Sequence, residues 1–208
     1  MAMETSSSSA TSALPLDRIV LALLVWFGVV WLAAPNLTWL DSSELTAAGV
    51  TLGVPHAPGH PLYVLLAHLI SLIPLGTVAF RVALLSGICA AAAAWFTADL
   101  VEELTPEEAN VTSSRIAAFT VALLLCASSA VWQQSVRAEV YTLHLALILW
   151  ATRDALRWHR DTSDGRHGRL ARVAFTLGLA CANHHLLPLL LLPALLFLLM
   201  SSPGATGD

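Results

Sequence analysis

The stretch Val82-Ala-Leu-Leu-Ser-Gly-Ile-Cys-Ala-Ala-Ala-Ala-Ala-Trp-Phe-Thr-Ala98 carries no charge and lacks the polar stripe that marks a surface helix. It approaches the roughly 20 apolar residues that a helix needs to span a bilayer. Of all residues, 57% are hydrophobic and 12% are charged, whereas soluble domains are nearer half apolar and a quarter charged. The sequence therefore predicts an all-α, polytopic transmembrane helix bundle, an integral multi-pass membrane protein. Similar apolar runs occupy Ile19–Ala34, Ile116–Val131, Leu143–Ala151 with its flanks, and Val173–Met200.

Residues 1–15 are rich in Ser, Thr and Ala, and we expect them to form a disordered tail. Only Arg18 precedes the first apolar run, which is too little charge for the basic region of a signal peptide, so the first helix should remain uncleaved. The membrane module is expected over 16–200, followed by a C-terminal tail at 201–208. Nothing in the net charge of −4 indicates a nucleic-acid partner. Arg without Lys in an Ala- and Leu-rich chain is typical of a high-GC bacterium, so the expected location is a bacterial inner membrane.

The Arg residues indicate which side of the membrane each loop faces. Six of the ten lie within 153–172, and the positive-inside rule places this Arg-rich loop in the cytoplasm. Arg18 places the N-terminus there as well. No Arg or Lys occurs between Arg18 and Arg81, so the outer loop 35–81 should face outward, as should a second outer loop at 133–142. The six are Arg153, Arg157, Arg160, Arg166, Arg169 and Arg172.

The path of the chain follows from these sides. Leu62–Leu75 would be about 21 Å long as a helix, against a hydrocarbon core of roughly 30 Å. We therefore interpret it as an interfacial or re-entrant helix of the first outer loop. Spans are expected over the first apolar run, 82–100, 116–132 and 143–157. The final stretch, 173–200, is interrupted near its middle, and the sequence leaves open one kinked span or two half-helices.

Asp41 and Glu44 are the only carboxylates between Arg18 and Arg81. Charged groups near hydrocarbon are costly, so a pair kept there suggests a functional role. Three residues apart on a helix, they share one face, where one can act as a general base while the other holds a substrate or metal. A capping box fits the same spacing, with Asp41 as N-cap and Glu44 at the third position of a helix through Val50.

His56 and His60 lie four residues apart in Gly53-Val-Pro-His-Ala-Pro-Gly-His-Pro-Leu-Tyr63, a loop whose prolines and glycines exclude a helix. Imidazoles in such a loop can bind phosphate when protonated, bind a metal, or donate hydrogen bonds to a sugar. A simple interfacial turn is the structural alternative. Two His just downstream of two carboxylates favour a functional role.

Two further polar segments follow. The second outer loop reads Arg137-Ala-Glu139-Val-Tyr141, and loops held by rigid helices often carry active sites. Arg137 and Glu139 can also simply pair with each other at the membrane surface. The segment Asn183-His184-His185 interrupts an apolar run, so its side chains should face protein or a wet cavity. Hydrogen bonding between helices is the alternative there.

The order of these motifs resembles the GT-C superfamily of membrane glycosyltransferases, which use polyprenyl-phosphate-linked sugars. More specifically, it resembles the family of the transmembrane O-mannosyltransferase that modifies plexin-type receptors, with its bacterial members. Asp41-Ser-Ser-Glu-Leu-Thr-Ala-Ala-Gly-Val-Thr-Leu-Gly-Val-Pro-His-Ala-Pro-Gly-His-Pro-Leu-Tyr63 is similar to that family's signature, in which Asp-Ser-Gly-Glu and His-Pro-Pro-Gly-Tyr-Pro-Leu-Tyr are usual. Its later blocks are matched by Arg81-Val-Ala-Leu-Leu-Ser, Glu139-Val-Tyr-Thr-Leu and Gly178-Leu-Ala-Cys-Ala-Asn-His.

The likeness runs from about Leu16 to Met200 and retains both carboxylates. Ser43 stands where the family usually has Gly, Ala57 where it has Pro, and His60 where it has an aromatic residue. Members of the superfamily carry more helices and usually a soluble domain. The resemblance therefore implies that this chain corresponds to a GT-C-like N-terminal module, truncated relative to a longer enzyme.

The resemblance implies transfer of a hexose such as mannose from a polyprenyl-phosphate sugar to a protein or glycan hydroxyl on the outer face. Asp41 would act as general base on that hydroxyl, while Glu44 and His56 would orient donor or acceptor. Arg137 or a His of the 184–185 pair would neutralise the leaving phosphate. The implied substrate-binding residues are His56, His60, Arg137, Glu139, Tyr141, Asn183, His184 and His185.

Membrane lipid and the lipid-linked donor are the expected partners. The scheme requires no metal, although Asp41, Glu44, His56 and His60 include residue types that bind divalent ions. Two other classes stay open: a non-catalytic membrane scaffold or lipid-binding subunit, and a fragment of a transporter whose broken last helix is its substrate site. Mutation of Asp41 separates the first from an enzyme, and a transport assay in vesicles tests the second.

Overall fold

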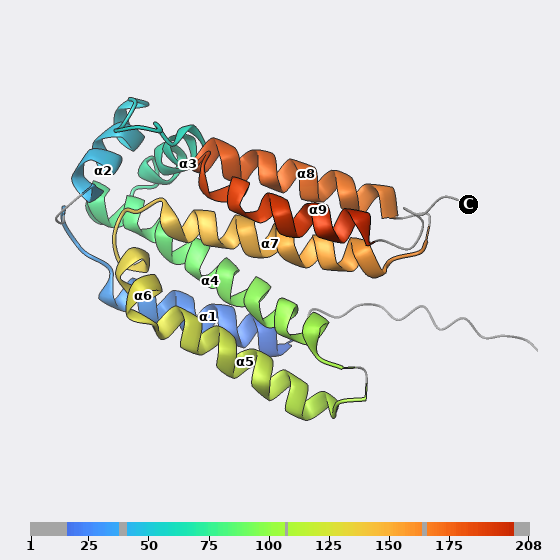
Figure 1. Ribbon diagram of the computed structural model, residues 1–208. Helices are drawn as coiled ribbons and strands as arrows, with labels where there is room; N and C mark the ends of the chain where they lie inside the picture. The colour runs from blue at the N-terminus through green and yellow to red at the C-terminus, as the bar shows by residue number, and fades with distance from the viewer. Residues whose placement is uncertain (1–15, 38–40, 107, 164–165, 202–208) are drawn as a thin grey trace, which may run out of the picture.

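A computed structural model describes residues 16–37, 41–106, 108–163 and 166–201 (Figure 1). Every regular element in these ranges is helical, which confirms the all-α prediction. The predicted tails at 1–15 and, apart from Ser201, at 201–208 lie outside the described residues. The elements are α1 (Leu16–Leu32), α2 (Ser42–Thr51), α3 (Pro61–Ser71), α4 (Val78–Leu104), α5 (Val111–Ala127), α6 (Ser129–Ser135), α7 (Tyr141–Arg160), α8 (Arg166–Asn183), the 3-10 helix η1 (Leu187–Leu191) and α9 (Leu192–Met200).

The central element is α4, which contains the apolar stretch that begins at Val82 and is about 40 Å long. One face carries small residues, and α1 and α5 approach closely there. At Gly87, a Cβ would lie 2.9 Å from Val29 of α1, so only glycine permits this approach. Within the described ranges, α4 is the one helix that is long and apolar enough to cross a membrane alone.

The prediction of one continuous helix over 116–132 is wrong. The chain bends by 67° between α5 and α6. Ser128 lies at the bend in an extended conformation, where its Oγ donates to the carbonyl of Leu125 at 2.6 Å and accepts from the amide of Val131 at 3.5 Å. One side chain thus contacts the end of one helix and caps the next. The bent pair would add a second spanning segment only if both parts are counted as one.

The open question at 173–200 resolves into two helices. After Asn183 the chain leaves α8, and η1 with α9 runs back beside α7 (Figure 1). The return is fixed at its far end, where Nδ1 of His159 lies 3.1 Å from the carbonyl oxygen of Leu198. The stretch is a helical hairpin and not one kinked helix.

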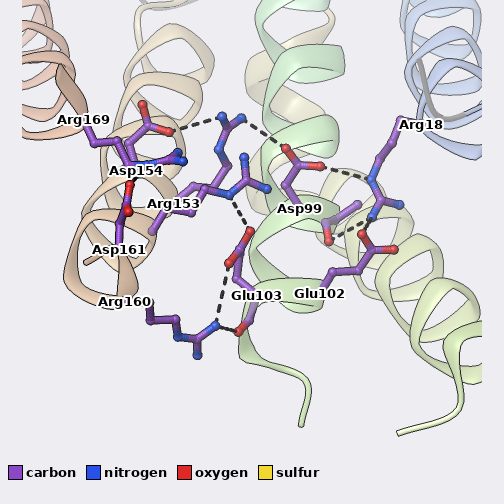
Figure 2. Close-up of polar contacts among 11 residues, drawn as sticks. Arg18, Asp99, Glu102, Glu103, Arg153, Asp154, Arg160, Asp161 and Arg169 are labelled. Atoms are coloured by element: carbon purple, nitrogen blue, oxygen red, sulfur yellow. Dashed lines mark hydrogen bonds and ion pairs between the residues drawn. The ribbon is translucent and has the colours of Figure 1, made fainter. Parts of the chain in front are cut away.

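We call the end of the bundle where α1 and α8 begin and α4 and α7 end the Arg end. Figure 2 shows its charged side chains. Asp99 of α4 lies between two guanidinium groups, 3.3 Å from Nε of Arg18 and 3.1 Å from Nη1 of Arg153. The Arg side chains predicted in the loop 153–172 lie mostly on α7 and α8 and pair with acidic groups. The further pairs are Arg18 with Asp17 and Glu102, Arg153 and Arg172 with Asp154, Arg157 and Arg160 with Glu103, and Arg169 with Asp161.

The opposite end, which we call the site end, carries α2 and α3 over the start of α4 and the end of α8 (Figure 1). The predicted short helix at Leu62–Leu75 is α3, which is 11 residues long and too short to span a bilayer. It packs tightly on α2, because a Cβ on Gly49 would lie only 2.7 Å from that of Ala67. Nη1 of Arg81 fixes the corner after α3 by donating to the carbonyl of Ser71 at 2.6 Å.

Candidate active site

Asp41 and Glu44 lie at the start of α2, but they do not form a capping box. The Asp41 side chain makes no cap hydrogen bond, and Glu44 instead binds the loop that follows the helix. Its Oε1 accepts from the amide of His56 at 2.6 Å, and its Oε2 lies 2.9 Å from Nδ1 of the same residue. The Asp41 carboxylate is half-exposed, with Oδ2 3.9 Å from Nε2 of His56. Both carboxylates therefore gather around one imidazole.

The mutual hydrogen bond changes the acidity of both partners. It is the largest cause that lowers the pKa of Glu44, and also the largest that raises the pKa of His56, to which the nearby charges of Asp41 and Glu44 add. The expected state near neutral pH is a carboxylate beside an imidazole that binds a proton more readily than usual.

We predict that the imidazole of His56 titrates above its ordinary value and that Glu44→Gln lowers its pKa, because the amide removes the hydrogen-bonded negative charge. The measurement is the NMR chemical shift of the His56 ring against pH, in protein freed of metal ions. His167, an exposed residue of the Arg end, serves as the internal control and should not respond. An unchanged His56 titration in Glu44→Gln would show that the pair does not form.

His60 has a structural role that the sequence did not reveal. Its φ of +44° is unusual for a residue with a side chain, and the ring is buried. Nδ1 lies 2.6 Å from the carbonyl oxygen of Asn183, and burial is the largest cause that lowers its pKa. A neutral ring that donates this hydrogen bond is therefore expected. His60 joins the loop to the end of α8 and is not a ready phosphate ligand.

Arg137 and Glu139 pair with each other, as the structural alternative predicted, with Nη2 of Arg137 3.3 Å from Oε1 of Glu139. Glu139 is 2% exposed, and its burial is the largest cause that raises its pKa. The backbone is held by Ser86 of α4, whose Oγ accepts from the amide of Glu139 at 3.1 Å. Arg137 also donates to Gln134 at 3.1 Å, so its guanidinium is engaged within the protein.

Asn183 behaves as the interhelical alternative predicted. It is fully buried and its Nδ2 donates to the carbonyl of Val140 at 3.0 Å, at the start of α7. His184, by contrast, lies among aromatic rings. Its centroid is 5.7 Å from that of His60, 5.9 Å from that of His144 and 6.5 Å from that of Tyr141. His185 is exposed and stacks on His184 at 6.3 Å. The structure therefore brings the His loop, the start of α7 and the end of α8 together.

Sequence reasoning missed three residues of this end: Tyr63, Thr142 and His144. A signal existed for His144, since it lies three residues after Tyr141 and shares its helix face. Among the described residues, several buried polar atoms here have no hydrogen-bond partner within the protein, and such groups are available to a polar ligand. They are Tyr63 Oη, Glu139 Oε2, Thr142 Oγ1, His144 Nδ1, Asn183 Oδ1 and His184 Nδ1.

An apolar groove of about 370 Å³ leads to this polar cluster between α6, α7 and η1. Its polar end is formed by Tyr141, Thr142 and His144. The groove is therefore amphipathic along its length, which suits a ligand with an apolar tail and a polar head. Its apolar walls are Ala130, Val131, Leu145, Ile148, Leu190 and Leu191.

Comparison with known proteins points to one family. Residues 41–206 match the family described as the protein O-mannosyl-transferase TMEM260 N-terminal domain. The chain is 34% identical over 172 residues to the protein O-mannosyl-transferase TMEM260 of Mus musculus, an alignment that covers 80% of this chain and 23% of that protein. The chain thus spans about a quarter of the length of this relative. No solved structure matches.

Proposed function

This chain belongs to the family of the protein O-mannosyl-transferase TMEM260 N-terminal domain, and on that premise we propose that it is the acceptor-activating module of a membrane glycosyltransferase. It transfers a hexose such as mannose from a polyprenyl-phosphate sugar to a protein hydroxyl. One observation carries the proposal: a half-exposed carboxylate, Asp41, lies with Glu44 and His56 at the same end of the bundle as an amphipathic groove.

The first step takes place at Asp41. A carboxylate oxygen accepts the proton of the acceptor hydroxyl, and the oxygen forms a bond to the anomeric carbon of the sugar as the bond to the phosphate breaks. Glu44 holds the His56 ring beside this carboxylate through two hydrogen bonds. His56 therefore orients the acceptor or the sugar, with its Nε2 on the side of Asp41.

The leaving polyprenyl phosphate fits the amphipathic groove. Its isoprenoid chain would lie along the apolar walls, and its phosphate would meet Thr142, His144 and His184, each with a buried polar atom that has no partner in the described protein. Donors aimed at a developing charge in a water-poor site lower the barrier to its formation. Arg137 supports the loop through Glu139 and Gln134 in place of the direct phosphate contact expected from the sequence.

We also propose that the bundle spans the membrane several times, with the Arg end in the cytoplasm and the site end on the outer face of a bacterial inner membrane. Large apolar side chains are exposed on α1, α5 and α9, where lipid would cover them; examples are Trp31 at 88%, Leu124 at 64% and Phe197 at 69%. Arg18 contacts the end of α4 at the Arg end, so both basic segments would face one side.

The direct test uses the chain in proteoliposomes with a polyprenyl-phosphate mannose donor and a protein acceptor. We expect the acceptor to gain one hexose mass for each polyprenyl phosphate released, measured by mass spectrometry. Absence of transfer with every polyprenyl-phosphate hexose tried would contradict the proposal. A lipid-binding scaffold would then remain, and it would still bind the donor.

The groove gives a second prediction. Leu145→Trp should fill it and raise the KM for a donor with a long isoprenoid chain by about tenfold, while a donor with a short chain is affected less. Loss of about 1.4 kcal/mol of apolar contact corresponds to that factor. The matched control is Leu177→Trp in the apolar groove between α7, α8 and α9 near the Arg end. Equal effects of both variants would place the isoprenoid chain elsewhere.

A further inference from the structure

Asp41, Glu44 and His56 each offer one ligand atom, and these atoms lie within 4.8 Å of one another. They come from two segments, the start of α2 and the loop that follows it. All three side chains are between 43% and 50% exposed, so an ion from solvent can reach them. Carboxylate oxygens with an imidazole nitrogen are a ligand set that suits divalent transition metals.

The geometry around His56 is that of a metal ligand with its supporting group. Oδ2 of Asp41 and Nε2 of His56 are 3.9 Å apart, too far for a hydrogen bond. Two ligands of one ion with bonds of about 2.0–2.2 Å lie only slightly closer than this. The other ring nitrogen, Nδ1, is bound to Glu44 at 2.9 Å, and metal-binding His residues almost always donate that second N–H to a carboxylate or carbonyl.

A buried carboxylate provides independent support. Glu139 is 2% exposed, and its Oε2 has no partner among the described residues. Its charge acts on both Asp41 and His56, so it faces this cluster. Three carboxylates then meet one paired guanidinium, Arg137, and a divalent cation would balance the excess negative charge.

We propose that Asp41 and His56 bind a divalent transition-metal ion such as Mn²⁺ or Zn²⁺, with Glu44 holding the imidazole in place and Glu139 supplying buried negative charge. The inference deepens the proposed function, because the ion would fix the Asp41 side chain and place positive charge near the donor phosphate. Ligation through Oδ2 leaves Oδ1 free to accept the acceptor proton. Metal binding itself requires neither donor nor acceptor.

The test is a Mn²⁺ titration of the purified chain in detergent, followed by electron paramagnetic resonance, with Zn²⁺ as competitor. We expect saturable binding that His56→Gln weakens by at least tenfold and that Glu44→Gln weakens by 10- to 100-fold, as loss of a supporting partner does elsewhere. The matched control is His167→Gln, an exposed His at the Arg end, which should bind as the wild type does. Wild-type affinity in His56→Gln, or no saturable binding in the wild type, overturns the proposal.

A second measurement needs no variant. Bound Mn²⁺ should broaden the NMR signals of the His56 ring while those of His167 stay sharp, and equal broadening of both contradicts a specific site. The outcomes also separate the two proposals. Mn²⁺ binding without sugar transfer leaves the metal site and removes the proposed function, whereas transfer without Mn²⁺ binding does the reverse.

Discussion

Asp41→Asn is expected to reduce sugar transfer by ~10²–10⁴-fold, the usual cost of losing a positioned general base. Asn keeps the size of Asp but cannot accept a proton at neutral pH. Stability should be kept, since the Asp41 side chain makes no cap hydrogen bond that the change could break. Transfer rate and melting temperature would be measured together, with and without added Mn²⁺, so that weakened metal binding is not mistaken for loss of the base.

The control for this experiment is Glu108→Gln, which makes the same carboxylate-to-amide change on an exposed residue of the Arg end. It should transfer at the wild-type rate. Near-normal transfer by a well-folded Asp41→Asn protein would remove Asp41 from the mechanism. Glu44 and the buried Glu139 would then be the next carboxylates to replace.

Asp99→Asn is expected to have the largest effect on stability. The Asp99 side chain is 14% exposed and lies between Arg18, which is 1% exposed, and Arg153. Removing its charge leaves two buried cations that share fewer carboxylates, and breaking a buried pair costs about 3 kcal/mol. The free energy of unfolding would be measured by denaturant titration in detergent micelles, followed by circular dichroism.

Glu102→Gln is the matched control, because Glu102 also pairs with Arg18 but its side chain is 37% exposed. An exposed pair contributes only ~0–1 kcal/mol, so this variant should unfold close to the wild type. If both variants lose the same amount, the charges of the Arg end do not act as a buried network.

The sequence was sufficient to find the site carboxylates and the helical class. Asp41 and Glu44 stood out because they are isolated in a long segment without other acids, and that isolation survives folding. Their partner was beyond sequence reasoning. Whether Glu44 turns back to cap α2 or reaches His56 depends on the path of the loop between them, which local spacing does not determine.

The errors in helix boundaries have a common physical cause. Apolar periodicity continues through Ser128, so nothing in hydropathy marks the bend, which depends on one hydroxyl that serves two helix ends. Likewise, hydropathy does not distinguish a kinked helix from a hairpin after Asn183, because α9 is as apolar as a continued span would be. Contacts such as that between His159 and Leu198 decide the matter.

The pairing of charge at the Arg end separates two properties that are usually treated as one. During insertion, positive residues near a membrane segment set its orientation, and acidic residues contribute little. In the finished protein, the guanidinium groups of Arg18, Arg153 and Arg157 are bound to carboxylates of α4. The nascent chain therefore presents a strong topological signal, whereas the folded protein retains much less charge with which to hold anionic lipid headgroups.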